Sequence, residues 1–136
     1  MTREEFEAWI MALPEVQRED SFGYAFFFVG DDHRLPFVTI ADSDSEYDRV
    51  SDLDREGVYR LNIGVSKATF DRLTADKTPD NIDYTALNVF LPHPHYARQH
   101  FVCILNPEGD HVEATRQLIR EAHSIARERS KRKSGN

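Results

Sequence analysis

The sequence predicts a single α+β domain in which an N-terminal and a C-terminal helix pack on a mainly antiparallel sheet. Helical patterns of apolar residues stand at the two ends of the chain, and short runs rich in β-branched and aromatic residues lie between them. No linker or internal repeat divides the 136 residues, a length typical of one domain. We expect the domain to span residues 1–126 and a basic C-terminal tail to follow at 127–136.

The first helix is predicted to begin at a capping box. Thr2 can accept a hydrogen bond from the third helical amide, and Glu5 can reach back to the amide of Thr2. The apolar residues that follow recur at helical spacing and end at Pro14, namely Phe6, Trp9, Ile10 and Leu13.

Three strands are predicted next. Residues 24–29 and 37–41 are rich in aromatic and β-branched residues, and the connection at 30–36 has the composition of a hairpin loop. An acidic loop at 42–57 leads to a third strand at 58–65.

The strand at 58–65 shows which face of the sheet is covered. Its odd positions are apolar, whereas Arg60 and Asn62 lie on the opposite face. One face of the sheet is therefore expected to be packed, and the other to be at least partly polar.

The second half of the chain alternates between short helices and a strand. Ser66 is a plausible N-cap for a helix at 66–73, and residues 82–91, although ambiguous, favour another short helix. The apolar run at 101–105 is typical of a strand covered on both faces. Asp110 can cap a last helix whose buried stripe is Val112, Thr115, Ile119, Ala122 and Ala126.

Net charge and composition disfavour several classes of protein. The net charge of −7 is unfavourable for a general nucleic-acid binder, although residues 120–136 carry six basic and only two acidic side chains. A basic segment at a helix C-terminus also complements the helix dipole.

Cys103, the single cysteine, excludes an internal disulfide and is expected to be a buried, inert thiol. The N-terminus lacks the apolar region of a signal peptide and no apolar run could span a bilayer, so we expect a cytoplasmic protein without a membrane partner.

Three of the six histidines stand between positions 91 and 100, in the stretch LPHPHYARQH. If the triplet around Pro94 is extended, the imidazoles of His93 and His95 project to one side, a spacing that can hold zinc. No acidic residue in the stretch supplies a further ligand. The alternative is a proline-restrained loop whose histidines bond to backbone or water, and we expect this loop and no cofactor.

Arg60, Asn62 and Tyr96 are the candidate ligand-binding residues. A guanidinium and an amide side by side can clamp a carboxylate or a phosphate. The alternative is that Arg60 pairs internally with a residue of the acidic loop such as Asp52 or Asp54, which is the commoner use of such an arginine.

Three stretches of the chain resemble a family of small bacterial proteins that is described only as a domain of unknown function. They are SDLDREGVYRLNIGVSKATF at 51–70, YTALNVFLPHPHY at 84–96 and VCILNP at 102–107. More distantly, the layout resembles MmcQ/YjbR-like domains, with LPEV at 13–16 in place of their LPGV-like turn and Phe101 where tryptophan is usual. This resemblance implies a compact antiparallel sheet flanked by helices, the double-wing fold, and it carries over no catalytic residue.

Three functions remain open. The first is a non-enzymatic binding module whose polar sheet face holds a small anionic ligand or a protein segment, as a monomer or weak homodimer. The second is a metal-dependent hydrolase that uses the histidines of 93–100, His93 and His95 first, as ligands and a loop carboxylate as base. The third is a nucleic-acid binder that uses the basic tail and the 30–36 connection as a wing. We rank them in this order and expect that the protein is not an enzyme.

Overall fold

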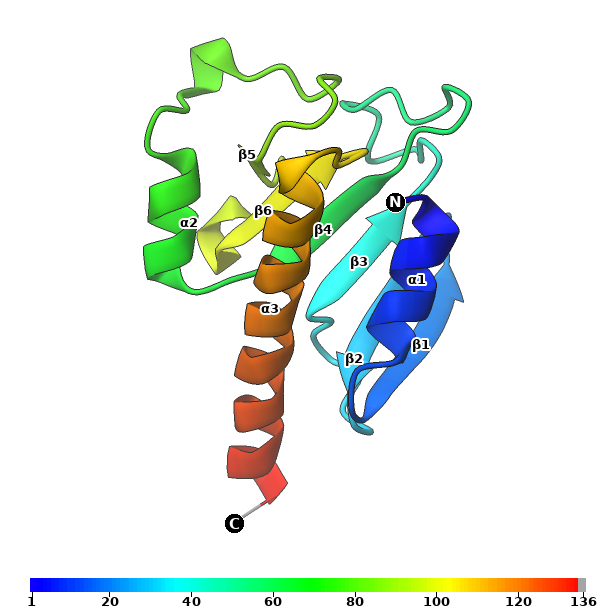
Figure 1. Cartoon of the computed structure of the whole chain (residues 1–136), viewed down its shortest axis with the longest axis vertical. Helices are drawn as coiled ribbons and strands as arrows, with labels where there is room; N and C mark the ends of the chain where they lie inside the picture. Colours follow the sequence, from blue (N-terminus) through cyan, green and yellow to red (C-terminus); the bar gives the residue numbers. More distant parts are fainter. Residues whose placement is uncertain (135–136) are drawn as a thin grey trace.

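The structure, a computed structural model, describes residues 1–134 and has the predicted α+β architecture (Figure 1). Its six-stranded sheet has the order β1-β2-β3-β4-β6-β5, and all neighbouring strands are antiparallel. The helices and strands, in chain order, are α1 (Arg3–Met11), β1 (Val16–Ser21), β2 (Tyr24–Val29), β3 (Val38–Ala41), β4 (Arg60–Gly64), α2 (Lys67–Thr74), the 3-10 helix η1 (Pro79–Asn81), β5 (Leu91–Pro92), the 3-10 helix η2 (Ala97–Gln99), β6 (Phe101–Leu105) and α3 (Asp110–Ser134).

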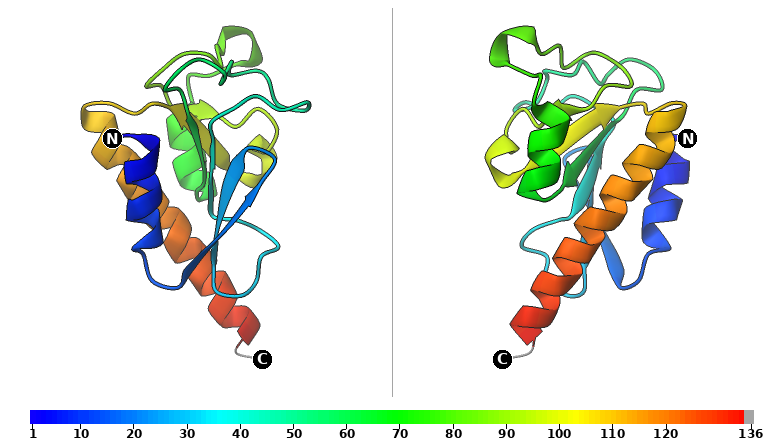
Figure 2. Two further views of the ribbon diagram at one scale, coloured as in Figure 1. Left: turned by 90° about the vertical axis from the view of Figure 1, so that its right-hand side faces the viewer. Right: turned by 60° about the vertical axis from the view of Figure 1, so that its left-hand side comes forward.

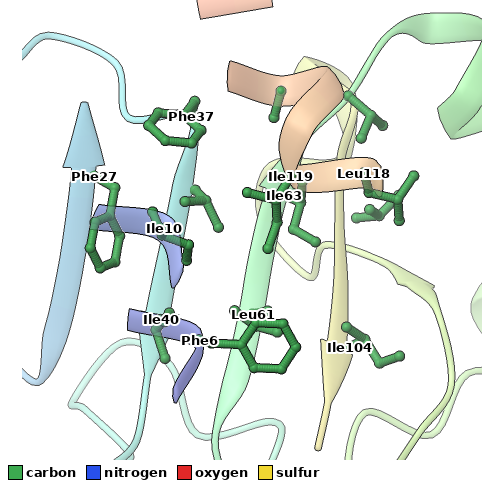
Figure 3. Packing of buried hydrophobic residues seen from close by; sticks show 14 of the residues in the cluster. Phe6, Ile10, Phe27, Phe37, Ile40, Leu61, Ile63, Ile104, Leu118 and Ile119 are labelled. Carbon is green, nitrogen blue, oxygen red and sulfur yellow. The ribbon is translucent and has the colours of Figure 1, made fainter. Parts of the chain in front are cut away.

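Helices α1 and α3 cover the same face of the sheet, as Figures 1 and 2 show. Because side chains alternate along a strand, this face takes the residues at odd positions of β2 and β4 and those at even positions of β3 and β6. They pack against α1 and α3 in one apolar core (Figure 3), which includes Phe6, Phe27, Ile40, Leu61, Ile104 and Ile119. The covered face that the strand pattern predicts is thus confirmed. We call the opposite side of the sheet the second face.

The starts of α1 and α2 follow the predicted capping chemistry. The Oγ1 atom of Thr2 accepts from the amide of Glu5 at 3.1 Å, and the Glu5 carboxylate accepts from the amide of Thr2 at 2.9 Å. Ser66 likewise accepts from the amide of Thr69 at the start of α2. Asp110, which the sequence suggested as the cap of the last helix, is instead the first residue of α3.

Strand β1 was not predicted. It joins β2 through a two-residue turn formed by Phe22 and Gly23, both with positive φ, and Ser21 lies opposite Tyr24. The sequence VQREDS lacks the alternation of apolar and polar residues that marks a half-buried strand, since its last four residues are all polar. These four residues are also exposed. Tertiary pairing with β2 determines its conformation instead.

The predicted helix at 82–91 is wrong. The carboxylate of Asp83 accepts from the amide and the hydroxyl of Thr85, a local turn that competes with helix formation. Asn88 has a left-handed φ of 62°, and its amide donates to the carbonyl of Leu105. The segment is therefore irregular until it pairs with β6 as the short strand β5.

The basic residues near the C-terminus belong to α3, which continues to Ser134 and extends beyond the sheet in Figure 1. Residues 135 and 136 of the expected tail lie outside the described residues, and the division of the chain at 126/127 stays a prediction. Within residues 1–134, no helix is long and apolar enough to cross a membrane.

Candidate functional site

A buried polar network lies on the second face where β2, β3 and β4 run side by side. Arg60 and Asn62 project from β4 to this face, as their even positions predict, and Thr39 of β3 stands opposite Asn62. Arg60 is the largest fully buried side chain, with 0% of its surface exposed, and Asn62 is almost as completely enclosed. The polar side chains of the second face are therefore buried inside the protein at this point.

Asp48 is the partner of Arg60. The two guanidinium nitrogens Nη1 and Nη2 donate to the two carboxylate oxygens of Asp48, with Nη1 3.1 Å from Oδ1. Nη1 also donates to the hydroxyl of Ser51 at 3.0 Å, and Nε donates to Oδ1 of Asn62 at 2.9 Å. The Nδ2 atom of Asn62 in turn donates to the hydroxyl of Thr39 at 2.9 Å. Hydrogen bonds between a guanidinium and a carboxylate are roughly twice as strong as those between neutral groups, and two of them together fix the geometry of the pair.

The acidic loop positions Asp48 by means of its own side chains. Ser45 and Asp48 exchange two backbone hydrogen bonds. The Asp44 carboxylate accepts from the amide of Leu53, and the Asp54 carboxylate accepts from the amide of Asp44. The side chain of Leu53 is buried against β3 and β6. Several acidic side chains thus close the loop over the sheet.

The internal ion pair expected for Arg60 forms, but with a different residue. Asp52 has a left-handed φ and an exposed side chain whose Oδ2 lies 3.7 Å from Nε of Arg55. Asp54 caps the turn of the acidic loop instead of reaching β4. Asp48 alone of the three lies where the loop crosses the polar end of β4.

Burial and pairing move the pKa values of the network in opposite directions. Burial acts to raise the pKa of Asp48, but hydrogen bonds from Arg60 and Tyr24 outweigh it, and the pKa lies below its ordinary value. Burial likewise acts to lower the pKa of Arg60, and Asp48 outweighs it. The Tyr24 hydroxyl donates to Asp48 at 2.5 Å, and burial together with this carboxylate raises the Tyr24 pKa to about 12. The pair is therefore fully charged near neutral pH.

The ring of His93 lies next to this network and is held in one tautomer. Its Nδ1 atom accepts from the backbone amides of His95 at 2.9 Å and Tyr96 at 3.0 Å, so the ring proton is on Nε2. Burial first, and then the charge of Arg60, lower the pKa of His93 to about 3, so the ring is neutral at pH 7. Among residues 1–134 the Nε2 atom has no hydrogen-bond partner, and it retains some exposure to solvent although the residue as a whole is buried.

His95 and Tyr96 surround this ring at the surface. The ring of His95 lies 6.0 Å from that of His93 and the ring of Tyr96 lies 5.0 Å from it, measured between centroids. Both side chains are exposed, Tyr96 by 56%. His95 also lies close enough to Asp48 to contribute to the lowering of its pKa. The structure thus gathers the predicted residues into one region, with Arg60 and Asn62 beneath and His93, His95 and Tyr96 above.

The proposed metal pair has contacts that oppose metal binding. The Nδ1 lone pair of His93 is occupied by two amide donors, and binding through Nε2 would place a proton on Nδ1 against those donors. Among the described residues, no group of three or more histidine, cysteine, aspartate or glutamate side chains is arranged to hold a metal ion.

Sequence reasoning did not find Tyr24, Asp48, Ser51 or Thr39 as members of the network. The even positions of β2 and the odd positions of β3 share the second face with Arg60, and this parity could have indicated Tyr24 and Thr39. No comparable signal distinguishes Asp48 from the other acidic residues of its loop. Cys103 of β6 lies opposite Asn62 of β4, and burial raises the pKa of the Cys103 thiol to about 12, as expected for an inert thiol.

Two hollows lie away from the network. One of about 490 Å³ has Phe26, Phe28 and His33 in its lining. The other, of about 240 Å³, is lined in part by Arg34 of the 30–36 connection and Arg129 of α3, the two segments that a nucleic-acid binder would use. Arg34 is already paired with Asp32 at 2.9 Å, which reduces the positive field of this surface.

A family model described as "Family of unknown function (DUF6194)" matches residues 1–135 of the chain. Comparisons with curated proteins and with solved structures found no match. None of the comparisons relates the chain to MmcQ/YjbR-like domains. Since the match spans nearly the whole sequence, the chain belongs to this family of unknown function, DUF6194.

Proposed function

We propose that the protein is a non-enzymatic binding module that holds a small carboxylate ligand at the surface formed by His93, His95 and Tyr96. The observation that carries the proposal is the Nε2–H group of His93. It is a neutral donor with a fixed orientation, it has no partner among the described residues, and it belongs to a residue that is only 5% exposed. A donor oriented in this way recognises a hydrogen-bond acceptor without prior rearrangement.

The buried network supports this surface from below. Arg60 and Asn62 make their hydrogen bonds inside the protein, so their role in the proposal is to fix the floor of the site and not to clamp the ligand directly. The charge of Arg60 also keeps His93 neutral, because it adds to the lowering of the His93 pKa. The ligand would therefore meet a donor whose charge is constant across the physiological pH range.

The pKa values favour binding over acid–base catalysis. The pKa values of Tyr24 and Cys103 lie at about 12 and that of His93 at about 3, so none of the three exchanges a proton readily near pH 7. General acid–base catalysis works best with groups whose pKa lies near the operating pH. This distribution suits a site that holds a ligand without changing it.

A carboxylate fits the surface better than a larger anion. Tyr96 offers a half-exposed ring and hydroxyl, and His95 an exposed imidazole, beside the single fixed donor of His93. A carboxylate can accept from His93 with one oxygen and from Tyr96 or His95 with the other. Because the acidic loop lies close by, a dianionic phosphate would meet more repulsion than a monocarboxylate.

The test is an NMR titration at pH 7 with benzoate and succinate as probes and benzamide as the neutral analogue of benzoate. We expect carboxylates to shift the amides of His95 and Tyr96 and the Nε2 resonance of His93. His93→Phe keeps an aromatic ring but removes the donor, and it should weaken benzoate binding by at least about tenfold, because a hydrogen bond to a charged group contributes about 1.5–3 kcal/mol.

The control is Tyr59→Phe, which removes a hydroxyl that donates to the carbonyl of Met1 on the helix-covered side of the sheet. It should leave benzoate affinity unchanged, whereas Tyr96→Phe should reduce it. Equal binding of benzoate by wild type and a folded His93→Phe variant, or shifts confined to another surface, would overturn the proposal.

A further inference from the structure

Strand β1 forms an open edge of the sheet. Within residues 1–134 no strand pairs with its outer side (Figure 1), and its residues from Arg18 to Ser21 are exposed. In a two-residue hairpin the closing pair, here Ser21 and Tyr24, is hydrogen-bonded, so odd positions of β1 bond to β2. The bond from the amide of Gly30 to the carbonyl of Glu15 agrees with this parity. The backbone groups of Val16, Arg18 and Asp20 therefore point outward.

We infer that this edge pairs with the β1 strand of a second copy of the chain, in an antiparallel two-fold arrangement centred on Glu19. In this register Arg18 of each copy lies opposite Asp20 of the other, on the same face of the joined sheet. The charges therefore form two favourable cross-strand pairs. Within one copy, Arg18 donates to the carboxylates of Glu7 on α1 and of its own Asp20.

The charge pattern selects this register over its neighbours. Because the outward backbone groups of β1 lie at even positions, an alternative register must shift the pairing by two residues. One neighbouring register places Arg18 opposite Arg18, and the other places Asp20 opposite Asp20, so like charges meet at the centre. In the chosen register Glu19 faces Glu19, but two pairs of opposite charge flank this contact, and Nδ1 of His33 lies 3.0 Å from each Glu19 carboxylate.

Phe22 is a second, independent indication of a contact at this edge. It occupies a left-handed turn position with φ of 54°, where asparagine or glycine is favoured, and its side chain is 89% exposed. A bulky apolar residue that is both strained and solvated gains nothing within the isolated chain. In the two-fold register, Phe22 at the tip of each hairpin arrives beside Val16 of the other copy, a residue that is only partly buried.

The experiment is sedimentation equilibrium over a concentration series of the full chain. Wild type is expected to form a dimer. Arg18→Asp and Asp20→Arg should each weaken the dimer by at least about tenfold, because both symmetry-related pairs become repulsive. The double variant Arg18→Asp/Asp20→Arg exchanges the two charges and should restore association. Phe22→Asn should weaken the dimer although the monomer stays folded.

Lys67→Asp is the matched control, since it changes the net charge by the same amount as Arg18→Asp but lies on α2, where its partner is Asp71. It should leave the dimer intact. A wild-type chain that stays monomeric throughout the series would show that the charges of β1 protect the edge from pairing, and the inference would fall. It would also fall if the dimer did not respond to Arg18→Asp, or if the charge exchange failed to restore a dimer that both single variants had lost.

Discussion

Replacement of Arg60 by methionine is expected to destabilise the fold strongly. The variant removes both bonds to Asp48 and leaves that carboxylate in a site where its side chain is only 6% exposed. Asn62 and Ser51 lose their bonds to the guanidinium at the same time. Tyr24 would remain as the side-chain donor to Asp48.

The size of the effect follows from the burial of the pair. Removal of one partner of a buried ion pair costs about 3–5 kcal/mol, because the other charge is left without compensation. Domains of this kind have a total stability of about 5–15 kcal/mol, so we expect Arg60→Met to fold with a much reduced free energy of unfolding. The double variant Arg60→Met/Asp48→Leu should lose less than Arg60→Met alone, since it leaves no isolated charge.

The loss of unfolding free energy in Arg60→Met should be smaller at low pH than at neutral pH. In the wild type, the folded-state pKa of Asp48 lies below the unfolded value of about 3.9, so the pair stabilises the fold above that pH. This contribution is lost as the pH falls through the lowered folded-state pKa. In Arg60→Met, Tyr24 alone offsets burial as a side-chain donor, so the pKa of Asp48 should rise, and protonation of Asp48 should recover part of the lost stability on acidification. The deficit should therefore shrink between pH 7 and pH 4.

Urea unfolding followed by the fluorescence of Trp9 and by circular dichroism measures these free energies at both pH values. Lys67→Met is the control, because its pair with Asp71 is exposed and should contribute less than about 0.5 kcal/mol. A loss below about 1 kcal/mol for Arg60→Met, or a deficit that does not change with pH, would refute a charged buried pair.

Three further predictions concern the backbone. Gly64→Ala should cost about 1–3 kcal/mol in urea unfolding, because a Cβ atom would lie 2.9 Å from the ring of Phe101, and Phe101→Leu should relieve part of the loss. Thr2→Ala removes the N-cap of α1 and should cost about 1 kcal/mol, with lower helicity by circular dichroism; no change would mean that the cap is frayed in solution. Phe22→Asn should raise the stability of the monomer by about 0.5–1 kcal/mol, since asparagine tolerates the left-handed turn better, and a loss of stability would contradict the strain argument.

Sequence patterns predicted the elements whose local and tertiary preferences agree. The first helix carries its own capping box, and the strand at 58–65 alternates with the period of a sheet. The polar strand β1 and the irregular segment 82–90 were mispredicted because distant partners determine their conformation. β1 is defined by its pairing with β2, and the carbonyl of Leu105 holds Asn88 in its left-handed conformation.

The candidate site was predictable on the sheet but not in the loop. The parity of β4 placed Arg60 and Asn62 together on the second face. The choice of Asp48 over Asp52 or Asp54 depends on the path of the acidic loop. That path is set by backbone bonds and by the buried side chain of Leu53, which have no periodic signature in the sequence.

The burial of Arg60 changes which residues could meet a ligand. For the guanidinium to bind an external carboxylate, Asp48 would have to leave, and the acidic loop that closes over it would have to open. The price would be the loss of most of a buried ion pair. The Nε2–H group of His93 requires no such rearrangement, because it reaches solvent and its other ring nitrogen is already satisfied. In the proposed function, ligand recognition therefore falls to the 93–96 loop, and Arg60 acts from the interior through its effect on the pKa of His93.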